Sequence, residues 1–311
     1  MIDTKILPRL GSLFSILLFI FCVWVLAREL RGFEFREVLD YLASLPKYRV
    51  YLAIGLTALS YWVMTWYDVL ALLYIRHQLP YRKIAFTAFI AYAISNTVGF
   101  TIFIGGAIRY RLYKKWGLSP FDIAQVTAFV SLTFWLGLLA LGGLVFPQKP
   151  VEISHMLGLH FLSIHSLGII FITIIISYFI ATIIGKGNFQ LFNREFRFPS
   201  WKYSIAQITT ATADWVLAGG VFYCLLPPQS HLSYQEFFGI YLMAHFAGIL
   251  SNVPAGIGVF ETIILLLLSS SFSKVTILGS ILAYRGIYYL STLLIGVILL
   301  GLYEMRHRLF S

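Results

Sequence analysis

The stretch YLMAHFAGILSNVPAGIGVFETIILLLL, residues 241–268, decides the fold. It is apolar enough for a membrane, yet polar and helix-breaking residues interrupt it near its middle: Ser251, Asn252, Pro254, Gly256 and Gly258. Proline removes a backbone donor and glycine weakens a helix, so a helix should break here. Backbone groups freed at membrane depth need partners from protein or from a water-filled cavity. The stretch therefore predicts a broken helix beside an interior site of a membrane protein.

The composition of the whole chain agrees with a membrane location. Of its 311 residues, 59% are hydrophobic and 12% are charged, whereas a soluble domain carries about 25% charged residues. This excludes a soluble enzyme, a disordered tail, a disulfide scaffold and a fibrous protein. The excess of 23 Lys and Arg over 13 Asp and Glu lies in short loops, as is typical at an anionic cytoplasmic leaflet. We expect no nucleic-acid partner.

Apolar runs between charges predict an all-α polytopic membrane protein with eight hydrophobic segments. No stretch is long and polar enough for a soluble domain, so residues 1–311 are expected to form one transmembrane domain. Residues 33–45 fit either a helix lying on the membrane surface or an ordinary loop helix. The predicted segments are 10–27, 48–75, 84–108, 120–146, 162–184, 203–226, 237–268 and 275–303.

The third segment resembles the seventh. Residues 88–113, which begin in this segment and continue past its end, read AFIAYAISNTVGFTIFIGGAIRYRLY and contain three glycines expected to break the helix: Gly99, Gly105 and Gly106. Asn96 in this segment and Asn252 in the seventh precede glycine-rich turns. We consider both asparagines as substrate-binding residues, and capping of a broken helix end explains them as well.

Further matches indicate an internal repeat. The motif around Asp68 (Asp-Val-Leu-Ala) returns around Asp214 (Asp-Trp-Val-Leu-Ala), each one segment before a break. The common order of these matches favours two duplicated halves, about 1–150 and 160–305, over chance similarity between apolar sequences. Broken helices at matching positions of two halves indicate a transporter-type site near the bilayer midplane.

The length of the seventh segment bears on topology. Residues 237–268 would form a helix of about 48 Å, too long for a hydrocarbon core of about 30 Å. We therefore expect both broken segments to be re-entrant, with inverted halves and with both termini in the cytoplasm. The third segment is short enough to span, and a topology in which both segments span also satisfies the positive-inside rule.

Charged residues inside apolar segments are costly and require a partner or a function. We expect them to bind substrate, and Glu261 and Arg285 to form an ion pair within one central site that includes Arg109 and Asp214. The alternative is that these charges pair only to hold helices together. The candidates are Asp68, Arg109, Asp214, Glu261 and Arg285.

The sequence shows no catalytic set. Cys22 and Cys224 form no disulfide or metal-ligand pattern, and His155, His160 and His165 are spaced so that they share no helix face. Catalytic and nucleotide-binding motifs are missing. We predict no metal, no cofactor and no enzymatic activity.

Two stretches resemble a known family. SNTVGFTIFIGGAIRYRLYKKWGLS (95–119) and SNVPAGIGVFE (251–261) are similar to the signature stretches of the lysylphosphatidylglycerol synthase transmembrane region. This region is the flippase half of the MprF proteins and also occurs alone in YbhN-like and AglD-like membrane proteins. The resemblance covers nearly the whole chain, with Ala255 where the family often has a second glycine. MprF proteins continue into a soluble aminoacyltransferase domain, and this sequence ends at Ser311, so the resemblance implies translocation without aminoacyl transfer.

The resemblance and the interior site together favour a lipid flippase in a bacterial or archaeal cytoplasmic membrane. A phospholipid or lipid-linked head group would cross through a polar groove between the broken helices. Arg109 and Arg285 would contact its phosphate, and the three acids would contact a cationic group or the arginines. The alternative is a non-transporting partner of a lipid-modifying or glycosyl-transferring enzyme. Membrane lipids, such an enzyme and a second copy of the chain are the partners considered.

Overall fold

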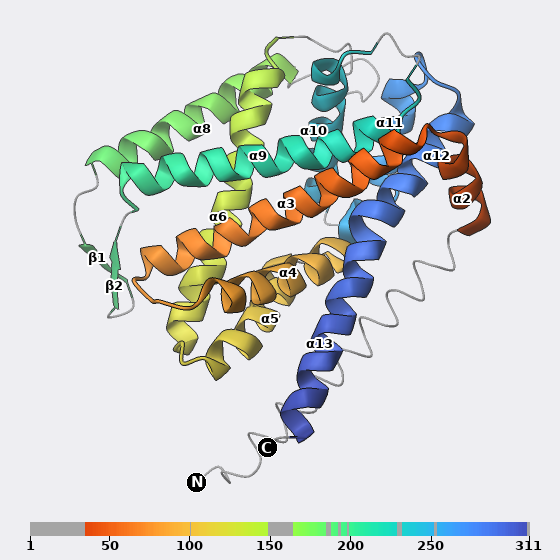
Figure 1. The fold of residues 1–311 in the computed structure, drawn as a ribbon. Helices are drawn as coiled ribbons and strands as arrows, with labels where there is room; N and C mark the ends of the chain where they lie inside the picture. The colour runs from red at the N-terminus through yellow and green to blue at the C-terminus, as the bar shows by residue number, and fades with distance from the viewer. Residues whose placement is uncertain are drawn as a thin grey trace.

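The computed structural model describes residues 35–99, 101–148, 164–184, 188–191, 194–197, 199–228, 232–251 and 254–309. Helices dominate this part of the chain (Figure 1). The predicted segment 10–27 lies outside it, as does Asn252. The helices are α2 (Phe35–Ser44), α3 (Lys47–Tyr74), α4 (Tyr81–Val98), α5 (Thr101–Lys115), α6 (Pro120–Val145), α8 (Ile164–Ile184), α9 (Trp201–Leu225), α10 (Tyr234–Leu250), η1 (Pro254–Gly256), α11 (Val259–Leu268), α12 (Lys274–Tyr284), η2 (Arg285–Leu290) and α13 (Ser291–Leu309).

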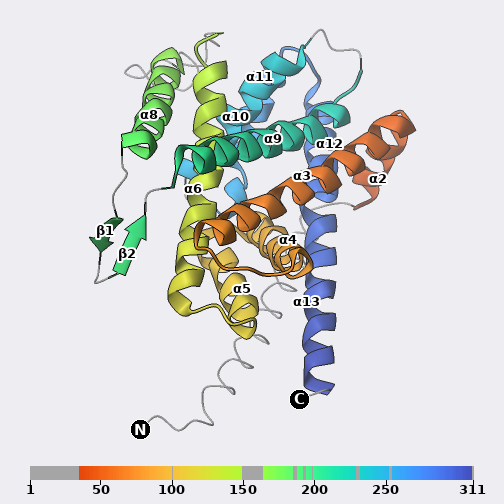
Figure 2. The ribbon, with the colours of Figure 1, turned by 60° about the vertical axis from the view of Figure 1, so that its left-hand side comes forward.

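A short antiparallel hairpin interrupts this helical pattern between α8 and α9. Its strands are β1 (Asn188–Leu191) and β2 (Arg194–Arg197). The residues between these two helices are polar, as is usual in a loop, and their pattern does not predict a hairpin. The hairpin lies at the edge of the molecule, away from the helix core (Figure 2).

Five helices of the described chain are long and apolar enough to cross a membrane. They are α3, α6, α8, α9 and the last helix, in which α12, η2 and α13 run continuously. Their bounds follow the predicted segments closely, because the length of an apolar run between charges is a local property that the bilayer thickness selects. The prediction of a helical membrane protein is thus confirmed.

The third and seventh segments are pairs of shorter helices. In the third, α4 ends at Val98 and α5 begins at Thr101, with Gly99 between them at a φ of 84°. In the seventh, η1 separates α10 from α11, and Gly256 and Gly258 have φ values of 64° and 86°. Glycine adopts positive φ without the steric cost that a side chain meets, so both segments turn where the sequence predicts a break.

Gly105 and Gly106 do not break a helix, contrary to the prediction. Both lie inside α5, where they allow close packing. A Cβ on Gly105 would lie 3.0 Å from Nη1 of Arg109, and a Cβ on Gly106 would lie 3.2 Å from Cγ2 of Thr127. The glycine pair therefore brings α5 close to its neighbours and leaves room for the arginine.

Helices α3 and α9 lie side by side through the centre of the molecule (Figures 1 and 2). They run antiparallel: Arg49 near the start of α3 donates to the carbonyl of Leu226, and at the other end the rings of Tyr74 and Tyr203 are 6.4 Å apart. Helix α6 packs against α9, and α8 packs against α6. Asp68 of α3 and Asp214 of α9 are thereby both placed in the interior.

Candidate functional site

The two helix breaks lie close together. The turn η1 contacts α4, and η2 contacts both α3 and α4. At this junction Thr97 donates to the carbonyl of Tyr289 at 3.4 Å, and Nδ2 of Asn96 lies 3.8 Å from Sδ of Met64. Asn96 is partly exposed. The end of α4, the turn after α10 and the last membrane helix therefore surround one region.

Glu261 and Arg285 form the predicted ion pair beside this region. Nε of Arg285 donates to Oε1 of Glu261 at 2.7 Å, and Nη2 donates to the same oxygen. The other oxygen, Oε2, accepts the backbone N–H of Gly258 at 2.6 Å, in the first turn of α11. The side chains of Glu261 and Arg285 are 19% and 11% exposed. This pair is thus tied to a helix break and is still within reach of a ligand.

Arg109 does not join Glu261 and Arg285 in an ion pair. It makes a two-pronged contact with Asp68, in which Nε donates to Oδ1 and Nη2 to Oδ2, both at 2.8 Å. Tyr113 also donates to Asp68, at 2.8 Å. The side chains of Arg109 and Asp68 are 1% and 0% exposed. The sequence singled out both residues, and the structure pairs them with each other away from the surface.

Asp214 is buried and hydrogen bonded to neutral groups. Ser60 donates to its Oδ1 at 2.6 Å, and Tyr67 donates to its Oδ2 at 3.0 Å. Oγ of Ser60 is also 3.0 Å from the hydroxyl of Tyr288. Among the described side chains, no Lys, Arg or His lies within ion-pair distance of Asp214. A buried carboxylate without a cation is costly, so this site favours either a proton or a bound cationic group.

Tyrosine rings connect the surroundings of Asp214 to both charge pairs. On one side the ring of Tyr67 is 5.9 Å from that of Tyr92, which lies 4.9 Å from the Arg109 guanidinium carbon. On the other side the ring of Tyr288 is 5.0 Å from that of Tyr289, a residue of the same turn as Arg285. A band of polar aromatic groups therefore runs through the interior between the two pairs.

Sequence reasoning missed these tyrosines and the turn η2. The sequence contains 19 tyrosines, and each one taken alone is typical of the aromatic residues of a membrane protein. Their spacing was the available signal, since Tyr284, Tyr288 and Thr292 recur every four residues and share a helix face. The segment η2 is a π-helix inside a helix predicted as regular. Such insertions are frequent at functional sites, and no proline or glycine pair announces this one.

The described residues contain no group of three or more His, Cys, Asp or Glu placed to hold a metal ion. His245 is instead part of the tyrosine band: its Nδ1 is 3.1 Å from the carbonyl of Tyr241, and its Nε2 is 3.4 Å from the hydroxyl of Tyr289. What the site offers chemically is one accessible ion pair, one buried acid and a set of hydroxyl groups.

Fold and site together define a polytopic helical membrane protein with a charged interior. The family model described as "Lysylphosphatidylglycerol synthase TM region" matches residues 12–296. The chain belongs to this family.

Two relatives match along most of both chains. An uncharacterised protein of Synechocystis sp. is 42% identical over 94% of this chain and 91% of its own length. The inner membrane protein YbhN of Escherichia coli is 31% identical over 93% of this chain and 91% of its own length. Phosphatidylglycerol lysyltransferase of Staphylococcus aureus is 23% identical over 96% of this chain, which corresponds to 34% of that protein.

Proposed function

We propose that this protein is a lipid translocase of a bacterial cytoplasmic membrane. The head group of a phospholipid or lipid-linked substrate crosses between α4–α5 and α10–α11, while its chains stay in the bilayer. The observation that carries the proposal is the Glu261–Arg285 pair, which is partly exposed and attached to a helix break. A polar head group can cross a hydrocarbon core of about 30 Å only if protein groups replace its water.

The proposal includes re-entry of both helix pairs, with the halves 1–150 and 160–305 inverted. Near the ends of α4–α5, Lys83 lies 5.3 Å above the ring of Trp116, which supports a hairpin that returns to its starting side. At the start of α10, the ring of Tyr234 lies 5.3 Å from that of Tyr223, near the C-terminal end of α9. Because α3 and α9 are antiparallel, the two hairpins would begin on opposite faces. Both termini would then be cytoplasmic.

Each charged group has a distinct part in this proposal. The guanidinium of Arg285 binds the phosphate, since its fork of donors fits phosphate oxygens. Glu261 releases Arg285 and receives a cationic part of the head group where one is present. Asp214 attracts the same cationic part further inside. Asp68 and Arg109 neutralise each other until α5 moves. Asn96, at the end of α4, contacts the head group, and Asn252, which precedes the second break in the sequence, is proposed to do the same.

A translocation assay on purified protein tests the proposal. The protein is reconstituted into liposomes with fluorescent phosphatidylglycerol, and a membrane-impermeant quencher reports the lipid that reaches the outer leaflet. We expect Glu261→Gln and Arg285→Gln to remain folded and to lower the rate at least about ten-fold, which corresponds to a barrier higher by roughly 1.4 kcal/mol. Matched controls are Asp40→Asn and Lys47→Gln, which remove one exposed charge each outside the site.

Exchange of the two charges separates function from structure. A purely structural pair predicts that Glu261→Arg combined with Arg285→Glu restores both folding and transport. A substrate site predicts that the exchange restores folding alone, because a carboxylate in η2 repels phosphate. Full transport in both single variants would refute the assignment.

A further inference from the structure

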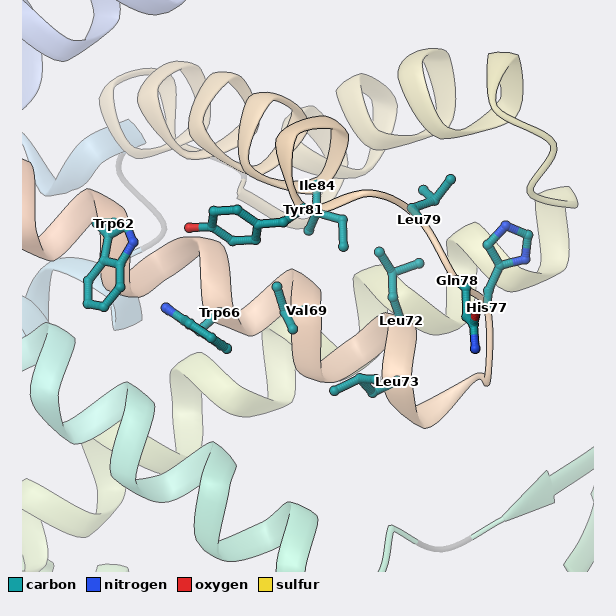
Figure 3. A pocket seen from close by; sticks show the side chains of 10 residues that line it. All are labelled: Trp62, Trp66, Val69, Leu72, Leu73, His77, Gln78, Leu79, Tyr81 and Ile84. Atoms are coloured by element: carbon teal, nitrogen blue, oxygen red, sulfur yellow. The ribbon is translucent and has the colours of Figure 1, made fainter.

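A lateral groove lies between α3 and the chain that leads into α4 (Figure 3). Its volume is about 590 Å³, within the range of about 300–1,000 Å³ that is usual for ligand sites. The indole of Trp62 lies at one end, and His77 and Gln78 lie at the other. Between them the wall is apolar and includes Trp66 and Leu72. The groove therefore has the form of an apolar trough with a polar end.

The polar end belongs to a basic segment, which comprises the loop after α3 and the first residues of α4. Residues 76–83 contain Arg76, Arg82 and Lys83 and no acid. All three side chains are exposed, and none of them forms an ion pair with any described residue. The loop follows the end of α3, a helix long enough to span a membrane. These charges would thus be placed near lipid head groups. Arg76 and Arg82 are available to an anion, whereas Lys83 lies over the ring of Trp116.

Arg76 has an unusual backbone conformation for a side chain of its size. Its φ is 58°, and it follows α3 in a turn where its own N–H donates to Leu73 and that of His77 donates to Leu72. Glycine is the usual residue at this position of such a turn, because a Cβ is strained there. An arginine at such a position points to a use for its guanidinium.

We propose that this groove binds an anionic phospholipid, with one acyl chain along α3 and the phosphate at the polar end, where His77 and Gln78 line the groove and Arg76 directly precedes them in the chain. The proposal rests on the translocase function and names its substrate class and its first contact with the protein. The groove follows one side of α3, and another side of the same helix carries Ser60, Tyr67 and Asp68. A lipid held here lies against the helix that also lines the interior site.

Quenching of tryptophan fluorescence tests the groove directly. The full chain is reconstituted into bilayers containing phosphatidylglycerol or phosphatidylcholine with brominated chains, because bromine quenches indoles in contact with it. Subtracting the fluorescence of the Trp62→Phe, Trp66→Phe double variant isolates the signal of the two indoles that line the groove. We expect half-maximal quenching at a several-fold lower fraction of phosphatidylglycerol than of phosphatidylcholine.

Replacement of the strained arginine gives a sharper test. Arg76→Gly should weaken the preference for phosphatidylglycerol about five-fold, the effect of one basic residue near a membrane surface. It should also raise the melting temperature, because glycine relieves the positive φ. Lys47→Gln, which removes an exposed charge at the other end of α3, should leave the preference unchanged. Equal quenching by the two lipids, or an unchanged preference in Arg76→Gly, would overturn the proposal.

The quenching assay does not depend on transport. A preference for phosphatidylglycerol in a protein that moves no lipid would uphold the groove and refute the translocase. Transport that Glu261→Gln abolishes, together with no lipid preference at the groove, would refute the groove and uphold the translocase.

Discussion

At the scale of single residues, burial separates the charge pairs of this protein into two kinds. The ion pair of Asp68 with Arg109 is almost completely buried. The side chains of a second ion pair, Arg111 with Glu304, are 13% and 19% exposed. A charge left without its partner in the interior carries the full cost of its lost hydration. A charge near the surface recovers much of that cost from water. The two ion pairs have similar N–O distances, 2.8 Å and 2.7 Å. We nevertheless expect them to contribute differently to the stability of the protein.

Substitution of Asp68 tests this difference. We expect Asp68→Asn to lower the free energy of unfolding by about 3–5 kcal/mol, because Arg109 remains buried without a counter-charge. Denaturant unfolding in detergent micelles measures it. The matched control, Glu304→Gln, should lose about 1 kcal/mol or less. Equal losses in the two variants would contradict the distinction.

At the scale of the elements, small residues decide how closely the helices approach. Gly137 of α6 faces Ala211 of α9, and a Cβ there would lie 2.5 Å from the Ala211 Cβ and 2.8 Å from its backbone carbon. Small residues at such crossings let membrane helices pack backbone to backbone, which is a main source of their association in lipid. The α6–α9 crossing thus depends on the missing side chain.

Gly137→Ala should accordingly lower the free energy of unfolding by about 1–3 kcal/mol, because the added methyl group forces α6 away from α9. Gly55→Ala on α3 is its control, since no atom of the described part of the chain lies within 4 Å of a Cβ at that position. That variant should be neutral or more stable by up to about 1 kcal/mol. Thermal unfolding measures the stability of both variants. Equal stability of the two would show that the α6–α9 crossing tolerates a methyl group.

The elements also show what the sequence could predict. Segment positions and the two breaks depend on local properties, namely the length of apolar runs and the backbone chemistry of Gly99, Pro254 and Gly256. The partner of Arg109 could not be inferred, because several buried acids compete for it and only the packing of α5 on α3 selects Asp68. Gly105 was misjudged because glycine serves two purposes, a turn or a close approach, and sequence alone does not distinguish them.

At the scale of the whole molecule, the two hairpins make a prediction about sidedness. If α4–α5 is re-entrant, single cysteines at Gln78 and Lys114 are labelled by an impermeant reagent from the same side of the membrane. A cysteine at Gln235, in the first turn of α10, is labelled from the other side. The three positions are exposed, and Cys22 and Cys224 are first replaced by serine. Labelling of Gln78→Cys and Lys114→Cys from opposite sides would show that α4–α5 spans.

The two oxygens of the Glu261 carboxylate accept hydrogen bonds from different groups, one from the N–H of Gly258 and the other from Arg285. A phosphate that takes Arg285 would leave the bond to Gly258 in place, so α11 keeps its first turn. The freed carboxylate would then stand beside a second negative charge, and the repulsion shortens the residence time of the head group. Such a site releases its ligand soon after binding it, which suits passage better than storage.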